Sequence, residues 1–181
     1  MNALQSLLYT HLPVLPLLLP AFTGMLLLLM GDAPSGHGSG RLKWGRRISL
    51  LSVGLGLVLG LALVAEAAGG GLHVYRLGDW PAPFGIVLVI DRLSALMVLL
   101  TSLVAVPVLW YASGGWDAHG RHFHPLFQFQ LMGLCGAFVT GDLFNLFVFF
   151  EILLIASYVL MVHGQGRQRF QVGVQYVALN L

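Results

Sequence analysis

The chain has 181 residues, of which 57% are hydrophobic and only 9% are charged, and its mean hydropathy is +0.85. Soluble domains carry about 25% charged residues, so this composition excludes a soluble monomer, which would lack the polar groups to cover its surface. The net charge of +2 and the scattered basic residues exclude a nucleic-acid-binding protein, which needs a clustered basic face. The sequence therefore predicts an integral membrane protein that contacts the lipid bilayer and no nucleic acid.

Apolar segments follow one another along the chain at lengths suited to a bilayer, which takes roughly 20 residues of helix. We expect an all-α membrane domain over residues 1–181, with five complete transmembrane helices and the start of a sixth. In chain order the predicted spans are 12–30, 48–68, 86–111, 123–140, 143–162 and 170–181, the last incomplete. Residues 1–30 lack Lys and Arg, so we interpret 12–30 as a retained span rather than a signal peptide.

The connections between the predicted spans are short and polar. A short strand within 74–80, and with it a small hairpin outside the membrane, fits the second connection. Basic residues gather in alternate connections: Arg41, Lys43, Arg46 and Arg47 in the first, Arg121 in the third, Arg167 and Arg169 in the fifth, against only Arg76 and Arg92 elsewhere. The positive-inside rule therefore predicts that these three connections are cytoplasmic and that the N-terminus lies outside.

Glu151 is the ninth of the twenty residues in the fifth predicted span, so it lies near the bilayer midplane. A carboxylate at that depth costs about 2.5–3.5 kcal/mol on insertion scales. Desolvation favours its protonated form and an opposing cation favours its charged form, so a balanced Glu can bind and release a proton. The alternative is a protonated Glu that only bonds a neighbouring helix. The one lysine, Lys43, lies in a predicted cytoplasmic loop, so a cationic partner in the membrane is expected outside these residues.

Weaker candidates lie near the ends of the predicted spans. Asp142 and Asn145 stand at the outer end of the fifth span, where helix capping explains Asp142 equally well. Asp91 and Arg92 are placed to form a local ion pair at the outer entry of the third span. These four residues are therefore supporting candidates for the site of Glu151.

Aromatic and thiol side chains complete the set of candidates. Tyr158 lies on the same helical face as Glu151, whereas His124 and His163 lie at predicted cytoplasmic ends of spans, where they can exchange protons with water. Cys135 is interpreted as a small core residue, because one cysteine can hold neither a disulfide nor an iron–sulfur cluster. We expect no cofactor and no metal site.

A family resemblance rests on several stretches of sequence. Residues 140–158, TGDLFNLFVFFEILLIASY, resemble the fifth-helix motif of the D subunits of Mrp-type multisubunit Na⁺/H⁺ antiporters. Residues 78–89 (GDWPAPFGIVLV), 91–97 (DRLSALM) and 176–181 (YVALNL) resemble the same type of subunit. The resemblance covers nearly the whole chain and is most specific in residues 78–97 and 140–160.

The resemblance implies a fold of about 14 helices with inverted repeats and two broken helices. It also implies that Glu151 is an essential glutamate, working with a lysine on the seventh helix and with further lysines along a central polar axis. The sequence ends within the sixth helix of that pattern. We therefore expect an N-terminal fragment of such a subunit or a truncated reading frame.

The leading hypothesis is a subunit of a multisubunit monovalent cation/proton antiporter in the inner (plasma) membrane of a prokaryote. Its expected partners are the other subunits of the complex, protons and Na⁺, with K⁺ or Li⁺ left open. One alternative is a proton-pumping membrane subunit of an NADH:quinone oxidoreductase or hydrogenase complex, and another is an inert truncated fragment. The sequence has no nucleophile–base pair at a workable spacing, which argues against an enzyme.

Overall fold

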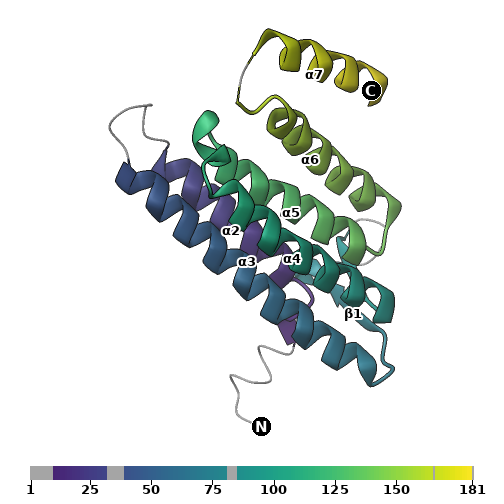
Figure 1. Ribbon diagram of the computed structural model, residues 1–181. Coiled ribbons are helices and arrows are strands. Elements are labelled where there is room, and N and C mark those ends of the chain that lie inside the picture. The colour runs from purple at the N-terminus through teal and green to yellow at the C-terminus, as the bar shows by residue number, and fades with distance from the viewer. Residues whose placement is uncertain (1–9, 32–38, 81–84, 165, 181) are drawn as a thin grey trace.

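The computed structural model describes residues 10–31, 39–80, 85–164 and 166–180. Its helices, in chain order, are α2 (Leu15–Met30), α3 (Ser39–Ala68), α4 (Arg92–Ala112), α5 (Phe123–Val139), α6 (Leu143–Met161) and α7 (Arg167–Asn180). Figure 1 shows α2, α3, α4 and α5 side by side as a bundle, with α6 packed against α5 and α7 beyond α6.

The described helices fall on the predicted apolar segments. Three are long and apolar enough to cross a membrane, at Gly40–Ala68, Arg92–Ala112 and Leu143–Met161, while α2 and α5 are apolar but shorter. The prediction of a mainly helical membrane protein is therefore confirmed. The boundaries differ most at α3, which begins at Ser39 rather than at residue 48. Lys and Arg are good helix formers, so the basic segment before residue 48 continues the helix instead of forming a loop.

A short antiparallel hairpin precedes α4. Strand β1 (His73–Arg76) pairs with β2 (Val87–Ile90), and a single 3₁₀ turn at Leu77–Asp79 follows β1. The short strand expected within 74–80 is thus present, but its partner lies inside the segment predicted as the start of the third span. Val87–Ile90 is rich in β-branched residues, which pack well in strands, so this apolar run pairs with β1 and the helix starts later.

A capping box fixes the start of α4. The side chain of Asp91 accepts a hydrogen bond from the backbone nitrogen of Ser94 at 2.7 Å, and the hydroxyl of Ser94 accepts one from the backbone nitrogen of Asp91 at 2.8 Å. This reciprocal pair satisfies two backbone donors that the first helical turn would otherwise leave without partners. The helix therefore begins at Arg92 rather than at residue 86.

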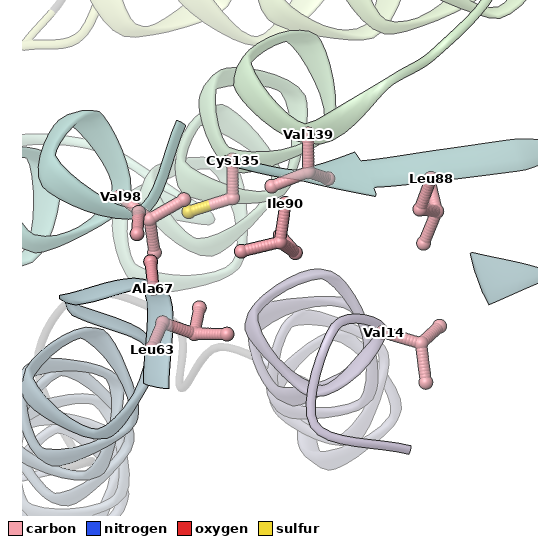
Figure 2. Packing of buried hydrophobic residues seen from close by; sticks show 9 residues of the cluster. Val14, Leu63, Ala67, Leu88, Ile90, Val98, Cys135 and Val139 are labelled. Carbon is pink, nitrogen blue, oxygen red and sulfur yellow. The ribbon is translucent and has the colours of Figure 1, made fainter. Parts of the chain in front are cut away.

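The main apolar core joins the hairpin to the bundle (Figure 2). Its buried members come from α3, β2, α4, α5 and the segment before α2: Val14, Leu63, Ala67, Leu88, Ile90, Ala95, Val98, Cys135 and Val139. The sulfur of Cys135 points towards Val98 in Figure 2, and the residue is only 5% exposed. The interpretation of Cys135 as a core residue is confirmed.

Two glycines of α5 lie directly against α6. A Cβ atom at Gly133 would lie 2.9 Å from the backbone nitrogen of Leu153, and one at Gly136 would overlap the ring of Phe149. We expect Gly133→Ala to lower the free energy of unfolding by about 1–3 kcal/mol, the usual cost of overpacking. Thermal unfolding of the purified protein would measure it, with Gly54→Ala as control because a methyl group there meets nothing within 4 Å. Equal losses in the two variants would contradict this account.

Candidate functional site

Helix α6 begins at a cap made by two of the predicted site residues. The carboxylate of Asp142 accepts a hydrogen bond from the backbone nitrogen of Asn145 at 2.7 Å, and the Asn145 amide also donates to it. Of the two interpretations of Asp142, helix capping is the one that the contacts support. The cap fixes where α6 starts, and hence the depth at which Glu151 lies.

Glu151 lies on the face of α6 that turns away from the bundle. The buried residues of α6 are Asn145, Phe149 and Ala156, whose spacings of four and seven residues form one stripe against α5. Glu151 follows Phe149 by two residues, which at 3.6 residues per turn places it on the opposite side of the helix. Within the described part of the chain, its carboxylate makes no hydrogen bond and no ion pair.

Tyr158 shares this outward face of α6 with Glu151, and Tyr176 of α7 packs against Tyr158. Tyr158 lies seven residues, or about two turns, beyond Glu151, and its ring meets that of Tyr176 on α7 edge-on, with centroids 5.6 Å apart. The Tyr158 hydroxyl has no hydrogen-bond partner among the described residues. The structure thus places Tyr158 on the same side of α6 as Glu151, about two turns away, with Tyr176, which was not among the predicted residues, against it. A joint role for Glu151 and Tyr158 stays a prediction.

The Glu151 carboxyl group can hold and release a proton, and the Tyr158 phenol on the same helix face can donate or accept a hydrogen bond. The remaining predicted residues lie elsewhere. Asp142 and Asn145 form the cap, and the other four lie at the ends of the helices. Glu151 and Tyr158 therefore lie on α6, with Tyr176 of α7 beside Tyr158, apart from the other predicted residues.

Asp117 forms a second cluster that the sequence did not single out. It lies in the 3₁₀ turn η2 (Trp116–His119), and its side chain is fully buried. Its two carboxylate oxygens accept hydrogen bonds from Nε and Nη2 of Arg46 at 2.6 and 2.7 Å, and Nε2 of His124 lies 3.0 Å away. Burial on its own would raise the pKa of Asp117, but the hydrogen bonds from Arg46 and His124 outweigh burial and lower that pKa below its ordinary value.

The two histidines expected to face water are instead packed into this end of the molecule. His124 is 6% exposed and His163 is 5% exposed. Nε2 of His163 lies 3.2 Å from the carbonyl oxygen of Trp116, and Arg169 donates to the carbonyl of His163 at 2.7 Å and stacks over the Trp116 ring. Both rings are thus packed against η2, His124 on Asp117 and His163 on Trp116, and their part in proton exchange stays a prediction.

The predicted ion pair between Asp91 and Arg92 is also wrong. Asp91 caps α4, and Nε of Arg92 donates to the carbonyl of Ala67 at 3.4 Å, so the two side chains serve different helices. Hydrogen bonds from the backbone and side chain of Ser94 lower the pKa of Asp91. Both residues therefore join α3, the hairpin and α4 at the end of the bundle away from Asp117.

Comparison with known proteins adds the family context. No protein-family model matches the chain. Over 176 residues it is 48% identical to the D subunit of a probable K⁺/H⁺ antiporter of Rhizobium meliloti, a match that covers 94% of this chain and 31% of the relative. Over 173 residues it is 39% identical to the D subunit of a Na⁺/H⁺ antiporter of Alkalihalophilus pseudofirmus, covering 94% and 34%. The chain is homologous to the D subunits of these antiporters. It spans about a third of the length of these relatives.

Solved structures agree with this relationship. The chain superposes on the Mrp complex from Dietzia sp. DQ12-45-1b with a TM-score of 0.81 and 27% identity, over 94% of this chain and 31% of the other. It also matches an archaeal membrane-bound sulfane sulfur reductase with a TM-score of 0.73 and 24% identity, a likeness that shows the fold alone. The resemblance inferred from residues 78–97 and 140–158 is confirmed.

Proposed function

We propose that this chain supplies the proton-binding glutamate of a monovalent cation/proton antiporter subunit, and that it acts as a transporter component rather than an enzyme. The observation that carries the proposal is the position of Glu151. It lies within an apolar helix that is long enough to cross a membrane, on the face turned away from α5, without a hydrogen bond or ion pair in the described part of the chain. Homology to subunits named as Na⁺/H⁺ and K⁺/H⁺ antiporters supports the same function.

The mechanism follows from the cost of charge in an apolar helix. When a cation approaches the outward face of α6, Glu151 is stabilised in its charged form and releases its proton. When the cation withdraws, the desolvated carboxylate takes a proton back. Tyr158, about two turns further along the same face of α6, lines the same side of the helix as Glu151 and meets Tyr176 of α7 edge-on. The alternation of these two states is what a proton relay requires.

The proposed topology places the N-terminus outside a prokaryotic plasma membrane, with five complete spans and the start of a sixth from an inverted-repeat fold of about 14 helices. The contacts of the described residues support the sidedness. Arg46, near the start of α3 in the first predicted connection, pairs with Asp117 of the third, and Arg169, at the start of α7 in the fifth predicted connection, stacks on Trp116 of the third. The three connections that are rich in basic residues thus meet at one end of the molecule, as the positive-inside rule requires of a cytoplasmic face. The other subunits of the antiporter are the proposed partners.

Everted membrane vesicles that contain the complete complex test the function and identify the cation. After a proton gradient is established, adding Na⁺, K⁺ or Li⁺ should collapse it, and the effective ion defines the specificity. The relatives carry both K⁺ and Na⁺ names, so each ion needs its own titration. A gradient that none of the three ions collapses would contradict antiport and favour the alternative of a redox-driven proton pump.

A further inference from the structure

A line of buried polar residues runs through the bundle, on the other side of α5 from Glu151. The Thr23 hydroxyl of α2 donates to Ser52 of α3 at 3.0 Å, and the Ser52 hydroxyl donates to the side-chain oxygen of Gln128 of α5 at 3.3 Å. The amide nitrogen of Gln128 donates to the hydroxyl of Ser49 at 2.9 Å. Gln128 and Ser49 are completely buried. One hydrogen-bonded network therefore joins three helices within an apolar bundle.

The network continues the stripe of residues that starts at Asp117. Arg46, Ser49 and Ser52 follow one another at intervals of three residues on α3, and His124 and Gln128 are four residues apart on α5. These spacings place each set on a single helix face. The polar line therefore runs from the Asp117 cluster about two helical turns into the bundle.

A small cavity lies at the inner end of this line, between α2, α3, α4 and α5. Ser52, Gln128, Ser102 and Cys135 are among its lining residues, and it offers about 20 Å³ to the centres of water molecules. A cavity needs about 10–15 Å³ by this measure to hold one water. Ser102 is 7% exposed, and its hydroxyl has no hydrogen-bond partner among the described residues. The cavity wall is mostly apolar, but Ser52, Ser102 and Gln128 bring polar atoms to it, and the Ser102 hydroxyl without a partner beside them favours a bound group that can both donate and accept.

We propose that this cavity binds one water molecule, which links Ser102 of α4 to Ser52 and Gln128. The water gives the Ser102 hydroxyl a partner and extends the polar network to the fourth helix of the bundle. Beyond the cavity, the apolar cluster around Val98 and Cys135 closes the line. The water site is therefore a pocket at the end of the line from Asp117. It is separate from the path that Glu151 would serve.

Radiolytic hydroxyl-radical labelling of the intact antiporter complex tests the proposal, because radicals made from a bound water oxidise side chains next to it. Cys135 is the reporter, since it lines the cavity and is only 5% exposed. In the wild type, Cys135 should be oxidised even when a scavenger removes radicals from the bulk solvent. In Gly56→Ala the new Cβ would lie 3.4 Å from the Ser102 hydroxyl oxygen and fill the space, so this label should be lost.

Gly54→Ala is the matched control on the same helix, because its new methyl group meets nothing within 4 Å, and it should keep the label. An unlabelled wild type, or a label that persists in Gly56→Ala, would overturn the proposal. A density map of the wild-type complex that resolves waters decides the question without any variant. A peak within hydrogen-bond distance of Ser102 and of Ser52 or Gln128 supports the site, and an empty cavity rejects it.

Discussion

Replacing Glu151 with Gln should reduce cation-driven proton movement by the assembled complex to the level of vesicles that lack the complex. Gln keeps the size and hydrogen-bonding capacity of a protonated Glu but cannot release a proton. Because the carboxyl group lies on the outward face of α6, away from the α5 contact, the change should leave the packing of the bundle intact. The measurement is the collapse of a preformed proton gradient on addition of the transported cation.

Two companion variants make this result specific. Glu66→Gln removes the other glutamate, which lies near the end of α3 with a side chain 32% exposed and 3.7 Å from His73, and it should leave antiport unchanged. Glu151→Asp keeps a titratable carboxyl group on a shorter side chain and should retain part of the activity. Near-normal antiport by Glu151→Gln would remove the basis of the proposed function. Equal losses in Glu66→Gln would indicate a general effect of lost carboxylates.

The sequence predicted the features that depend on local composition. Long apolar runs placed the helices, and counting along 143–162 placed Glu151 near the middle of its helix. The sequence placed the start of α4 too early. A run of four apolar residues such as 87–90 shows neither the alternation of a strand nor the 3.6-residue repeat of a helix, so its hydrophobic pattern cannot distinguish the two. Only the pairing with β1, a contact between distant segments, makes it a strand.

Features that depend on contacts between distant segments could not be predicted in the same way. Asp117 is 71 residues from Arg46, and no local sequence pattern connects the two. The usable signal was that Asp117 is an acidic residue in a predicted connection on the same side of the membrane as the basic ones. Likewise, helical periodicity places Tyr158 on the face of Glu151, but the packing of α5 and α7 decides which neighbour that face meets. Both histidines were placed correctly at helix ends, yet their burial depends on how the α6–α7 connection folds over η2.

The Asp117 cluster carries the largest expected effect on stability. Asp117→Asn keeps the shape of the side chain but removes its charge, so Arg46 and His124 lose the acceptor that they share. Breaking a buried charge pair costs about 3–5 kcal/mol, and we expect about 3 kcal/mol because the Arg46 side chain remains 28% exposed. Thermal unfolding at neutral pH measures the loss. Asp79→Asn is the matched control, since Asp79 is exposed and Asn tolerates its positive φ of 58°.

The pH dependence of that loss tests its electrostatic origin. The folded-state pKa of Asp117 is lowered, so its contribution to stability is present above the unfolded pKa of about 3.9 and disappears as the pH falls through the folded value. The difference in unfolding midpoint between wild type and Asp117→Asn should therefore be large at pH 7 and shrink below about pH 4. A difference that persists unchanged in acid would mean that the amide perturbs packing rather than charge. Equal midpoints at pH 7 would show that this ion pair does not hold η2 against the bundle.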